Sequence, residues 1–225
     1  MEEKKEIRCC IPVPKIENDG YDWWERHEKK CTLVREKRFD TVFFGDSITH
    51  FWTKENNVNY GEGHWDEVFA EKSVLNLGYG FDRIQNVLWR MENGELENQD
   101  PKNFVINIGT NQFSITQNYD GDPPEETAQG ICFLAEKLRK KFPEAKIIVM
   151  ALFPRSNKMQ EVIAVNQRLH QALDRRSDII LLDIFEKLLL KNAVPTQIDL
   201  SFYKDGTHLN RKGYEIWYEA LEKYL

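Results

Sequence analysis

Five short runs rich in apolar and β-branched residues recur along the chain, and longer segments of mixed polarity separate them. Short continuous apolar runs bounded by turn residues are typical of strands that are buried on both faces. Strands that alternate with helices favour a doubly wound parallel sheet, so we predict an α/β protein with five parallel strands. The predicted strands are residues 40–44, 73–77, 104–108, 146–152 and 178–182.

The segments between these strands predict helices. One of them begins Pro-Glu-Glu and ends in basic residues, an arrangement that the helix dipole favours. A chain of 225 residues is the size of one α/β domain, so we expect an irregular arm at 1–20 and a single domain at 21–225. The main predicted helices are residues 21–37, 82–91, 124–142, 157–175 and 210–225.

The charge balance and hydropathy exclude several classes of partner. The net charge is −6, whereas non-specific nucleic-acid binding needs clustered Lys and Arg, so we expect no nucleic-acid partner. No apolar stretch reaches the ~18 to 20 residues that cross a bilayer, and the charged start lacks the apolar segment of a secretory signal. We therefore expect a cytoplasmic protein without a membrane span, although a chain whose secretion signal had been removed would look the same.

No pattern in the sequence indicates a metal or a cofactor. The four cysteines lack metal-type spacing, and we expect them to be free thiols. His50 and His64 have no second ligand at metal spacing, so we expect them to be surface or packing residues. The glycines match neither a dinucleotide nor a P-loop motif.

A serine follows the first predicted strand directly. Gly45-Asp46-Ser47 ends the apolar run, and ligands of open α/β sheets bind at the carboxyl ends of the strands. Ser47 is therefore a candidate nucleophile. The alternative is that Asp46 or Ser47 only caps the next helix.

An imidazole and a carboxylate lie together near the other end of the chain, in Asp205-Gly206-Thr207-His208. A serine hydroxyl becomes a good nucleophile when an imidazole accepts its proton, and an anion must hold that imidazole in one tautomer. Ser47, His208 and Asp205 could supply these three roles. An Asp three residues before a His is also a common helix cap.

Two more turns follow predicted strands at the same edge of the sheet. Asn111 in Gly109-Thr110-Asn111 offers a side-chain amide, and the turn from Gly78 to Asp82 offers backbone N–H groups. Such donors can converge on a developing negative charge. Three turns of this kind at one edge favour an oxyanion site.

These four segments resemble, in order and spacing, the conserved blocks of the SGNH or GDSL-type hydrolases. Residues 86–96 further resemble the catalytic subunits of type Ib platelet-activating factor acetylhydrolase and related bacterial esterases. The resemblance runs from about Tyr21 to the C-terminus. It implies a three-layer, flavodoxin-like α/β/α sandwich, ester hydrolysis without a metal, and a triad of Ser47, Asp205 and His208.

The resemblance also implies an oxyanion hole. Its donors would be the backbone N–H groups of Ser47 and Phe81 and the side chain of Asn111. The family usually has Gly where this chain has Phe81, and a residue with a Cβ restricts φ. Gly80 is therefore the alternative backbone donor.

Aromatic side chains near these turns predict a pocket with apolar and stacking surfaces, although core packing is the alternative for Trp52. Arg155 follows the fourth strand and could contact a polar or anionic substrate. Such a pocket would suit an acetyl group beside a sugar face or a lipid stem. The expected pocket residues are Asp46, Trp52, Gly78, Tyr79, Gly80, Phe113, Phe153 and Arg155.

We therefore expect a serine esterase that hydrolyses short acyl esters, chiefly acetyl esters, of a carbohydrate or a small lipid. The resemblance also suggests a homodimer. One alternative is a thioesterase, lysophospholipase or amide hydrolase that uses the same triad. The other is a non-catalytic binding protein on a hydrolase fold, against which all the catalytic positions are filled.

Overall fold

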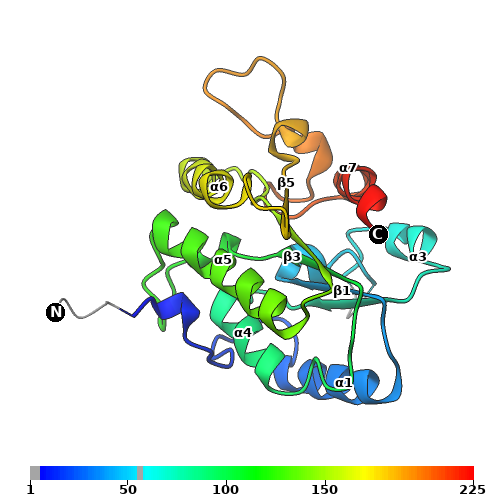
Figure 1. Ribbon diagram of the computed structural model, residues 1–225. Coiled ribbons are helices and arrows are strands. Elements are labelled where there is room, and N and C mark those ends of the chain that lie inside the picture. Colours follow the sequence, from blue (N-terminus) through cyan, green and yellow to red (C-terminus); the bar gives the residue numbers. More distant parts are fainter. Residues whose placement is uncertain (1–5, 55–57) are drawn as a thin grey trace.

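The computed structural model describes residues 6–54 and 58–225, which contain one five-stranded sheet. All neighbouring strands are parallel, and their order is β2-β1-β3-β4-β5. Helices cover both faces of the sheet, which confirms the predicted three-layer α/β/α sandwich (Figure 1). The strands are β1 (Thr41–Gly45), β2 (Val74–Gly78), β3 (Asn103–Asn107), β4 (Lys146–Met150) and β5 (Ile179–Leu182).

The helices begin and end close to the predicted residues. Asp22 starts α1 because its side chain accepts a hydrogen bond from the backbone N–H of Glu25, at 2.9 Å. The last α-helix is shorter than predicted and continues as a 3-10 turn. The helices are η1 (Arg8–Cys10), α1 (Trp23–Glu36), α2 (Ser47–His50), α3 (His64–Val68), α4 (Ile84–Glu92), η2 (Thr110–Phe113), α5 (Pro124–Lys141), α6 (Met159–Leu173), η3 (Phe185–Leu188), η4 (Leu200–Phe202), α7 (Arg211–Leu221) and η5 (Glu222–Tyr224).

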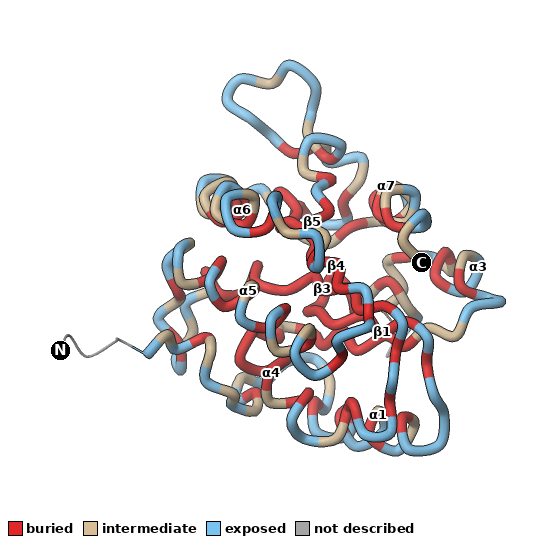
Figure 2. The backbone as a smooth tube through the Cα atoms, in the orientation of Figure 1, coloured by how far each residue is buried: buried red, intermediate tan, exposed pale blue. Residues whose placement is uncertain are grey.

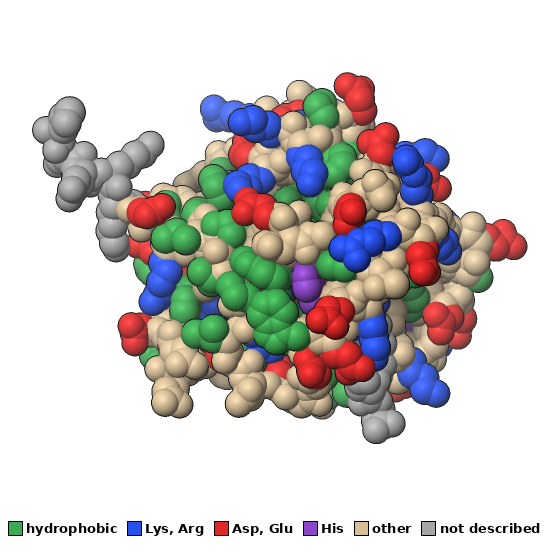
Figure 3. Space-filling model, turned by 90° about the horizontal axis from the view of Figure 1, so that it is seen from below, with side chains coloured by type: hydrophobic (Ala, Val, Ile, Leu, Met, Phe, Trp, Pro, Cys, Tyr) green, Lys and Arg blue, Asp and Glu red, His purple; other side chains and the backbone are tan. Residues whose placement is uncertain are grey.

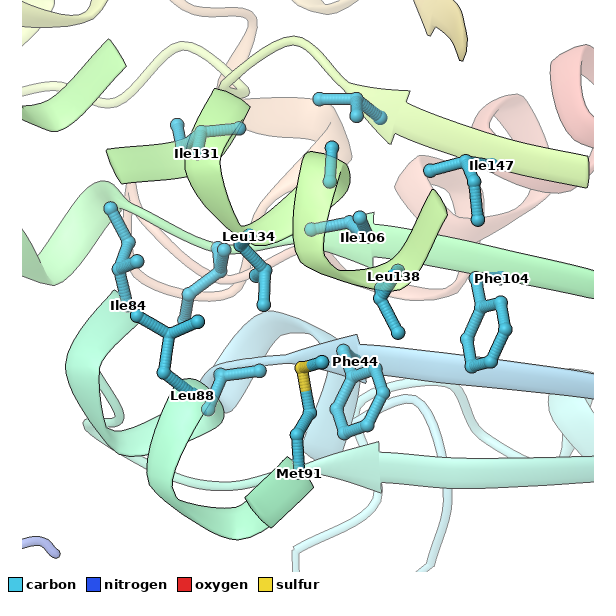
Figure 4. Packing of buried hydrophobic residues seen from close by; sticks show 14 of the residues in the cluster. Phe44, Ile84, Leu88, Met91, Phe104, Ile106, Ile131, Leu134, Leu138 and Ile147 are labelled. Atoms are coloured by element: carbon cyan, nitrogen blue, oxygen red, sulfur yellow. The ribbon is translucent and has the colours of Figure 1, made fainter. Parts of the chain in front are cut away.

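Alternate residues of each strand enter two separate cores. Phe44 of β1 belongs to a core that also contains apolar side chains of α1, α4, α5 and α6, whereas Phe43 packs against aromatic side chains of α3 and α7. Figure 4 shows the first core, where Leu88 of α4 and Leu138 of α5 lie over the strands. The strands are almost entirely buried in Figure 2, as continuous apolar runs require.

The strand order brings three loops together. Because β1 lies between β2 and β3, the loop after β1 is flanked by the loops after its two neighbours. Gly45 pairs in register with Gly78 on one side and with Asn107 on the other. A Cβ at Gly78 would lie 2.3 Å from the backbone nitrogen of His50, so only glycine lets α2 approach this strand so closely.

The described part of the N-terminal arm lies against the domain. Its 3-10 turn, η1, runs beside α4 and α5 (Figure 1). The Arg8 guanidinium binds the Asp122 carboxylate at 2.8 Å, and the Val13 N–H donates to the carbonyl of Gln85 at 3.2 Å. Apart from η1, this part of the arm has no helix or strand.

The face on the side of α1 and α4 carries both apolar and charged side chains (Figure 3). Trp24 of α1 is 48 % exposed and meets Trp89 of α4 edge to face, with ring centroids 5.2 Å apart.

Among the helices that the structure describes, none is long and apolar enough to cross a bilayer.

Candidate active site

Ser47, His208 and Asp205 form one continuous chain of hydrogen bonds. The Oγ of Ser47 lies 2.8 Å from Nε2 of His208, and Nδ1 of the same ring lies 2.7 Å from Oδ2 of Asp205. An ionised carboxylate can only accept, so Nδ1 carries the hydrogen and Nε2 accepts from the serine hydroxyl. This is the tautomer in which an imidazole can take a proton from Ser47.

The loop between β5 and α7 fixes the carboxylate. Oδ1 of Asp205 accepts from the backbone N–H groups of Thr207 and His208, at 3.0 and 2.9 Å, and Oδ2 faces the imidazole. Burial alone would raise the pKa of Asp205, but the hydrogen bonds from His208 and Thr207 outweigh it and hold the pKa below its usual value. Asp205 therefore both closes the turn and stays ionised beside the ring.

Two aromatic rings flank the imidazole. The ring centroids of Phe51 and Tyr60 lie 5.2 and 5.7 Å from that of His208. The His208 side chain keeps 21 % of its surface exposed, so the ring is held in place and still faces solvent.

Of the two roles that the sequence allowed at this turn, Asp46 takes that of the helix cap and Ser47 that of the candidate nucleophile. Asp46 caps α2, because its Oδ1 accepts from the N–H of Ile48 at 2.9 Å, whereas the Ser47 hydroxyl turns towards His208. Burial raises the pKa of Asp46 to about 7, although its hydrogen bond from Ile48 acts in the opposite direction.

The turn after β2 presents Phe81 in a strained backbone conformation. Its φ is +60°, a value that a bulky side chain seldom adopts. The N–H of Phe81 has no acceptor among the described residues, whereas that of Gly80 donates to Nδ1 of His50 at 3.1 Å. Of these two backbone donors, only the one on Phe81 is available to a ligand.

Asn111 lies in η2, after the strand on the other side of β1. Its Nδ2 donates to the carbonyl of Asp82 at 3.0 Å, which directs the amide towards the turn that contains Phe81. An amide nitrogen carries two hydrogens, so one of them remains for a second acceptor.

Comparison with known proteins decides the family. The model of the GDSL-like Lipase/Acylhydrolase family matches residues 43–216, which include every residue of the relay. The chain belongs to this family. It is therefore a hydrolase of the acylhydrolase kind, acting on esters.

Curated relatives of this GDSL-like hydrolase cover most of its length. Platelet-activating factor acetylhydrolase IB subunit alpha2 of Rattus norvegicus is 35 % identical over 181 residues, covering 78 % of this chain and 73 % of that protein. Subunit alpha1 of Pongo abelii is 29 % identical over 218 residues, covering 95 % and 87 %.

Solved structures share the fold. A GDSL-like lipase from Bacteroides thetaiotaomicron superposes with a TM-score of 0.70 at 21 % identity, covering 90 % of this chain and 98 % of that one. An acetyl xylan esterase superposes with a TM-score of 0.65 at 18 % identity, covering 84 % and 100 %.

The GDSL-like hydrolase does not use its aromatic residues as predicted. Trp52 has no exposed surface and stacks on Tyr214 in the second core, and Tyr79 has none and lies against Arg90. The prediction that these two rings line a pocket is wrong. The Trp52 ring gains more by entering the apolar core, whereas Tyr79 is buried among Arg26, Arg90 and Glu95, to which its hydroxyl donates. Phe113 and Phe153 are also core residues, 5 % and 3 % exposed.

The polar pocket candidates lie closer to the relay. Arg155 donates through Nη1 to the hydroxyl of Thr110 at 3.1 Å, next to Asn111 in the chain. Burial lowers the pKa of Arg155, while the carboxylates of Asp46 and Asp205 act in the opposite direction. Arg155 therefore interacts electrostatically with both acidic groups of the site.

A buried ionic network beneath the Phe81 turn had no signal in the sequence. Arg90 of α4 binds Asp82 at 2.9 Å and also binds Glu95, and all three side chains are fully buried. Oδ1 of Asp82 further accepts from Nε1 of Trp23 at 2.7 Å. Burial raises the pKa of Asp82 to about 6 despite Arg90 and Trp23. The network anchors the residue that follows Phe81.

His50 is a packing residue, one of the two outcomes expected for it. It is 2 % exposed, its ring contacts those of Tyr21 and Phe51, and its Nδ1 accepts the Gly80 N–H. Within residues 6–54 and 58–225, no group of three or more His, Cys, Asp or Glu side chains could hold a metal ion.

Proposed function

We propose that this chain is a serine esterase that removes short acyl groups, chiefly acetyl, through an acyl-enzyme on Ser47. The observation that carries the proposal is the unbroken relay from the Ser47 hydroxyl through His208 to Asp205, with both hydrogen bonds under 3 Å. Such a relay is needed to activate a hydroxyl, and a capping or packing role would not require it.

In the first half of the reaction, the Ser47 Oγ attacks the ester carbonyl carbon while its proton passes to Nε2 of His208. Asp205 stabilises the imidazolium that results. The electron pair of the carbonyl moves onto its oxygen, where the N–H groups of Ser47 and Phe81 and the Asn111 amide would receive it. His208 then gives its proton to the departing alcohol oxygen, leaving the acyl group on Ser47.

In the second half, water takes the place of the alcohol. His208 removes a proton from the water, which attacks the acyl carbon, and the same oxyanion donors receive the charge. Return of the proton to Ser47 Oγ releases the carboxylic acid and restores the relay.

The names of the relatives support the acetyl assignment. Acetylhydrolase subunits cover most of the chain, and one protein of the same fold is an acetyl xylan esterase. A short acyl group also agrees with the burial of Trp52 and Tyr79, whose rings add no apolar wall for a long chain. The alcohol of the ester is a carbohydrate or a small lipid in this proposal.

Hydrolysis of p-nitrophenyl esters graded from acetyl to octanoyl tests the acyl preference. We expect kcat/KM to be highest for acetyl and to fall with chain length, and no activity in Ser47→Ala. A steady rise towards octanoyl would contradict the acetyl assignment. Acetylated sugars, acetylated lipids, thioesters and amides then identify the leaving group.

A fluorophosphonate probe separates this proposal from a binding protein on the same fold. Only an activated serine reacts with it, so the wild type should be labelled at Ser47 and His208→Ala should not. A folded wild type that stays unlabelled would favour the non-catalytic alternative.

A further inference from the structure

The peptide unit between Gly80 and Phe81 is held by the N-terminal arm. Nζ of Lys15 donates to the carbonyl oxygen of Gly80 at 2.8 Å, and the hydroxyl of Tyr21 donates to the same oxygen at 3.1 Å. The contacts span 65 and 59 residues of sequence. Both residues precede the segment that matches the family, which begins at residue 43.

This carbonyl and the proposed oxyanion donor belong to one rigid group. The carbonyl of Gly80 and the N–H of Phe81 lie in a single peptide plane and, because the bond is trans, point in opposite directions. Fixing the carbonyl oxygen therefore fixes the direction of the Phe81 N–H. A cation on the oxygen also polarises the unit and makes its N–H a stronger donor.

Lys15 is buried in a site built around this oxygen. Its side chain is 1 % exposed, and its Nζ also binds Oδ2 of Asp19 at 3.3 Å. The ring centroids of Tyr21 and Phe81 lie 5.1 and 5.9 Å from the same nitrogen. A buried ammonium is costly without such partners, so a surface lysine that happened to touch the turn would not be placed like this.

The other side of Gly80 is fixed as well. Its N–H donates to His50, and a Cβ on Gly80 would lie 2.6 Å from Oδ2 of Asp19 and 3.0 Å from Cε1 of Tyr21. Glycine at this position is what allows the arm to pack directly on the turn. The clamp from both sides also opposes the relaxation of Phe81 from its positive φ.

We infer that Lys15 and Tyr21 are positioning residues for the oxyanion hole, acting through the Gly80–Phe81 peptide. The inference rests on the proposed function. As the Ser47 Oγ–carbon bond forms and the proton moves to His208, the carbonyl electron pair becomes an oxyanion opposite the Phe81 N–H. An interaction that strengthens only at this stage raises kcat and leaves KM almost unchanged.

Two variants test this role in the full chain, with p-nitrophenyl acetate as substrate. Removing one oxyanion donor typically costs ~10² to 10³ in kcat, so disturbing its support in Lys15→Met should cost about tenfold. Tyr21→Phe removes one of the two bonds to the oxygen and should cost less. Lys15→Arg keeps the charge and should retain more activity than Lys15→Met.

A matched control and a second readout separate positioning from general stability. Lys146→Met is the control, because Nζ of Lys146 also binds a backbone carbonyl, that of Tyr224, but on the exposed surface. Its kcat should equal that of the wild type. A trifluoromethyl ketone, which forms an oxyanion on Ser47, should lose affinity in Lys15→Met in parallel with the loss of kcat, while KM stays constant.

The outcomes are distinct. The inference would be overturned if folded Lys15→Met and Tyr21→Phe kept wild-type kcat and wild-type ketone affinity. It would also be overturned if these variants changed KM alone. If Lys15→Met does not fold, Tyr21→Phe decides by the same criteria. A wild type that neither hydrolyses p-nitrophenyl acetate nor reacts with fluorophosphonate would instead refute the proposed function, and the inference would fall with it.

Discussion

Ser47 and His208 lie 161 residues apart in the sequence, yet the Oγ of one lies 2.8 Å from the Nε2 of the other. The parallel sheet positions Ser47, because it places the loop after β1 at the edge where the strands end. The turn that Asp205 closes positions His208, because it directs the imidazole towards the same edge.

Replacing Asn111 with alanine should reduce kcat by ~10² to 10³ while the protein stays folded. The structural loss is one hydrogen bond to the carbonyl of Asp82, worth about 1 kcal/mol, so Tm should fall only slightly. Steady-state kinetics and thermal unfolding check both parts. Asn93→Ala is the control, because Nδ2 of Asn93 also donates to a carbonyl, that of Trp89, but on the exposed surface. Near-normal turnover in Asn111→Ala would contradict its role.

Replacing Arg90 with methionine should destabilise the fold strongly. Two fully buried carboxylates, Asp82 and Glu95, would lose their cation, and breaking a buried pair in this way costs about 3–5 kcal/mol. Urea unfolding of the variant measures the loss. Arg35→Met should change little, because the Arg35 pair with Glu97 is about half exposed. Equal effects of the two variants would show that the buried network does not anchor the turn.

Stability should depend on pH through Asp46. Burial raises its pKa to about 7, whereas the unfolded chain has the usual value near 4. Between these values the folded protein holds a proton that the unfolded chain has released, so the free energy of unfolding falls as pH rises from about 4 to about 7. Asp46→Asn removes this fall. Its advantage over the wild type should grow through that window and level off above it.

Urea unfolding at several pH values between 4 and 8 measures this difference. Asp178→Asn is the control, because a hydrogen bond from Arg176 lowers the pKa of the exposed Asp178 and places its window below the usual value. The control's difference from the wild type should therefore stay flat over the same range. A flat difference for Asp46→Asn as well would contradict the raised pKa.

The sequence predicted the strands, and the positions of Ser47 and Asn111 after them, for physical reasons that are local. Strands buried on both faces must be continuously apolar, so the apolar runs locate β1 to β5 within about two residues. The parallel sheet then placed the ends of β1, β2 and β3 at one edge. Ser47 and Asn111 follow two of those strand ends directly, and their nearness could be inferred without knowing a single side-chain contact.

What the sequence did not reveal depends on contacts between distant segments. Lys15 and Gly80 carry no pattern that links them, and the contacts that hold the arm, such as those of Lys15 and Val13, go to residues far away in the sequence. The direction of a side chain after a strand is equally hidden. Trp52 enters the core and His50 accepts the Gly80 N–H in the turn after β2, although both are only a few residues from Ser47.

The most direct test of the account is to trap the acyl-enzyme. The protein is mixed with p-nitrophenyl acetate, quenched in acid within the first turnover, digested and analysed by mass spectrometry. We expect one acetyl group per chain, carried by the peptide that contains Ser47 and absent from Ser47→Ala. Full hydrolytic activity with no acetyl on Ser47, or with the acetyl on another residue, would contradict the proposed mechanism.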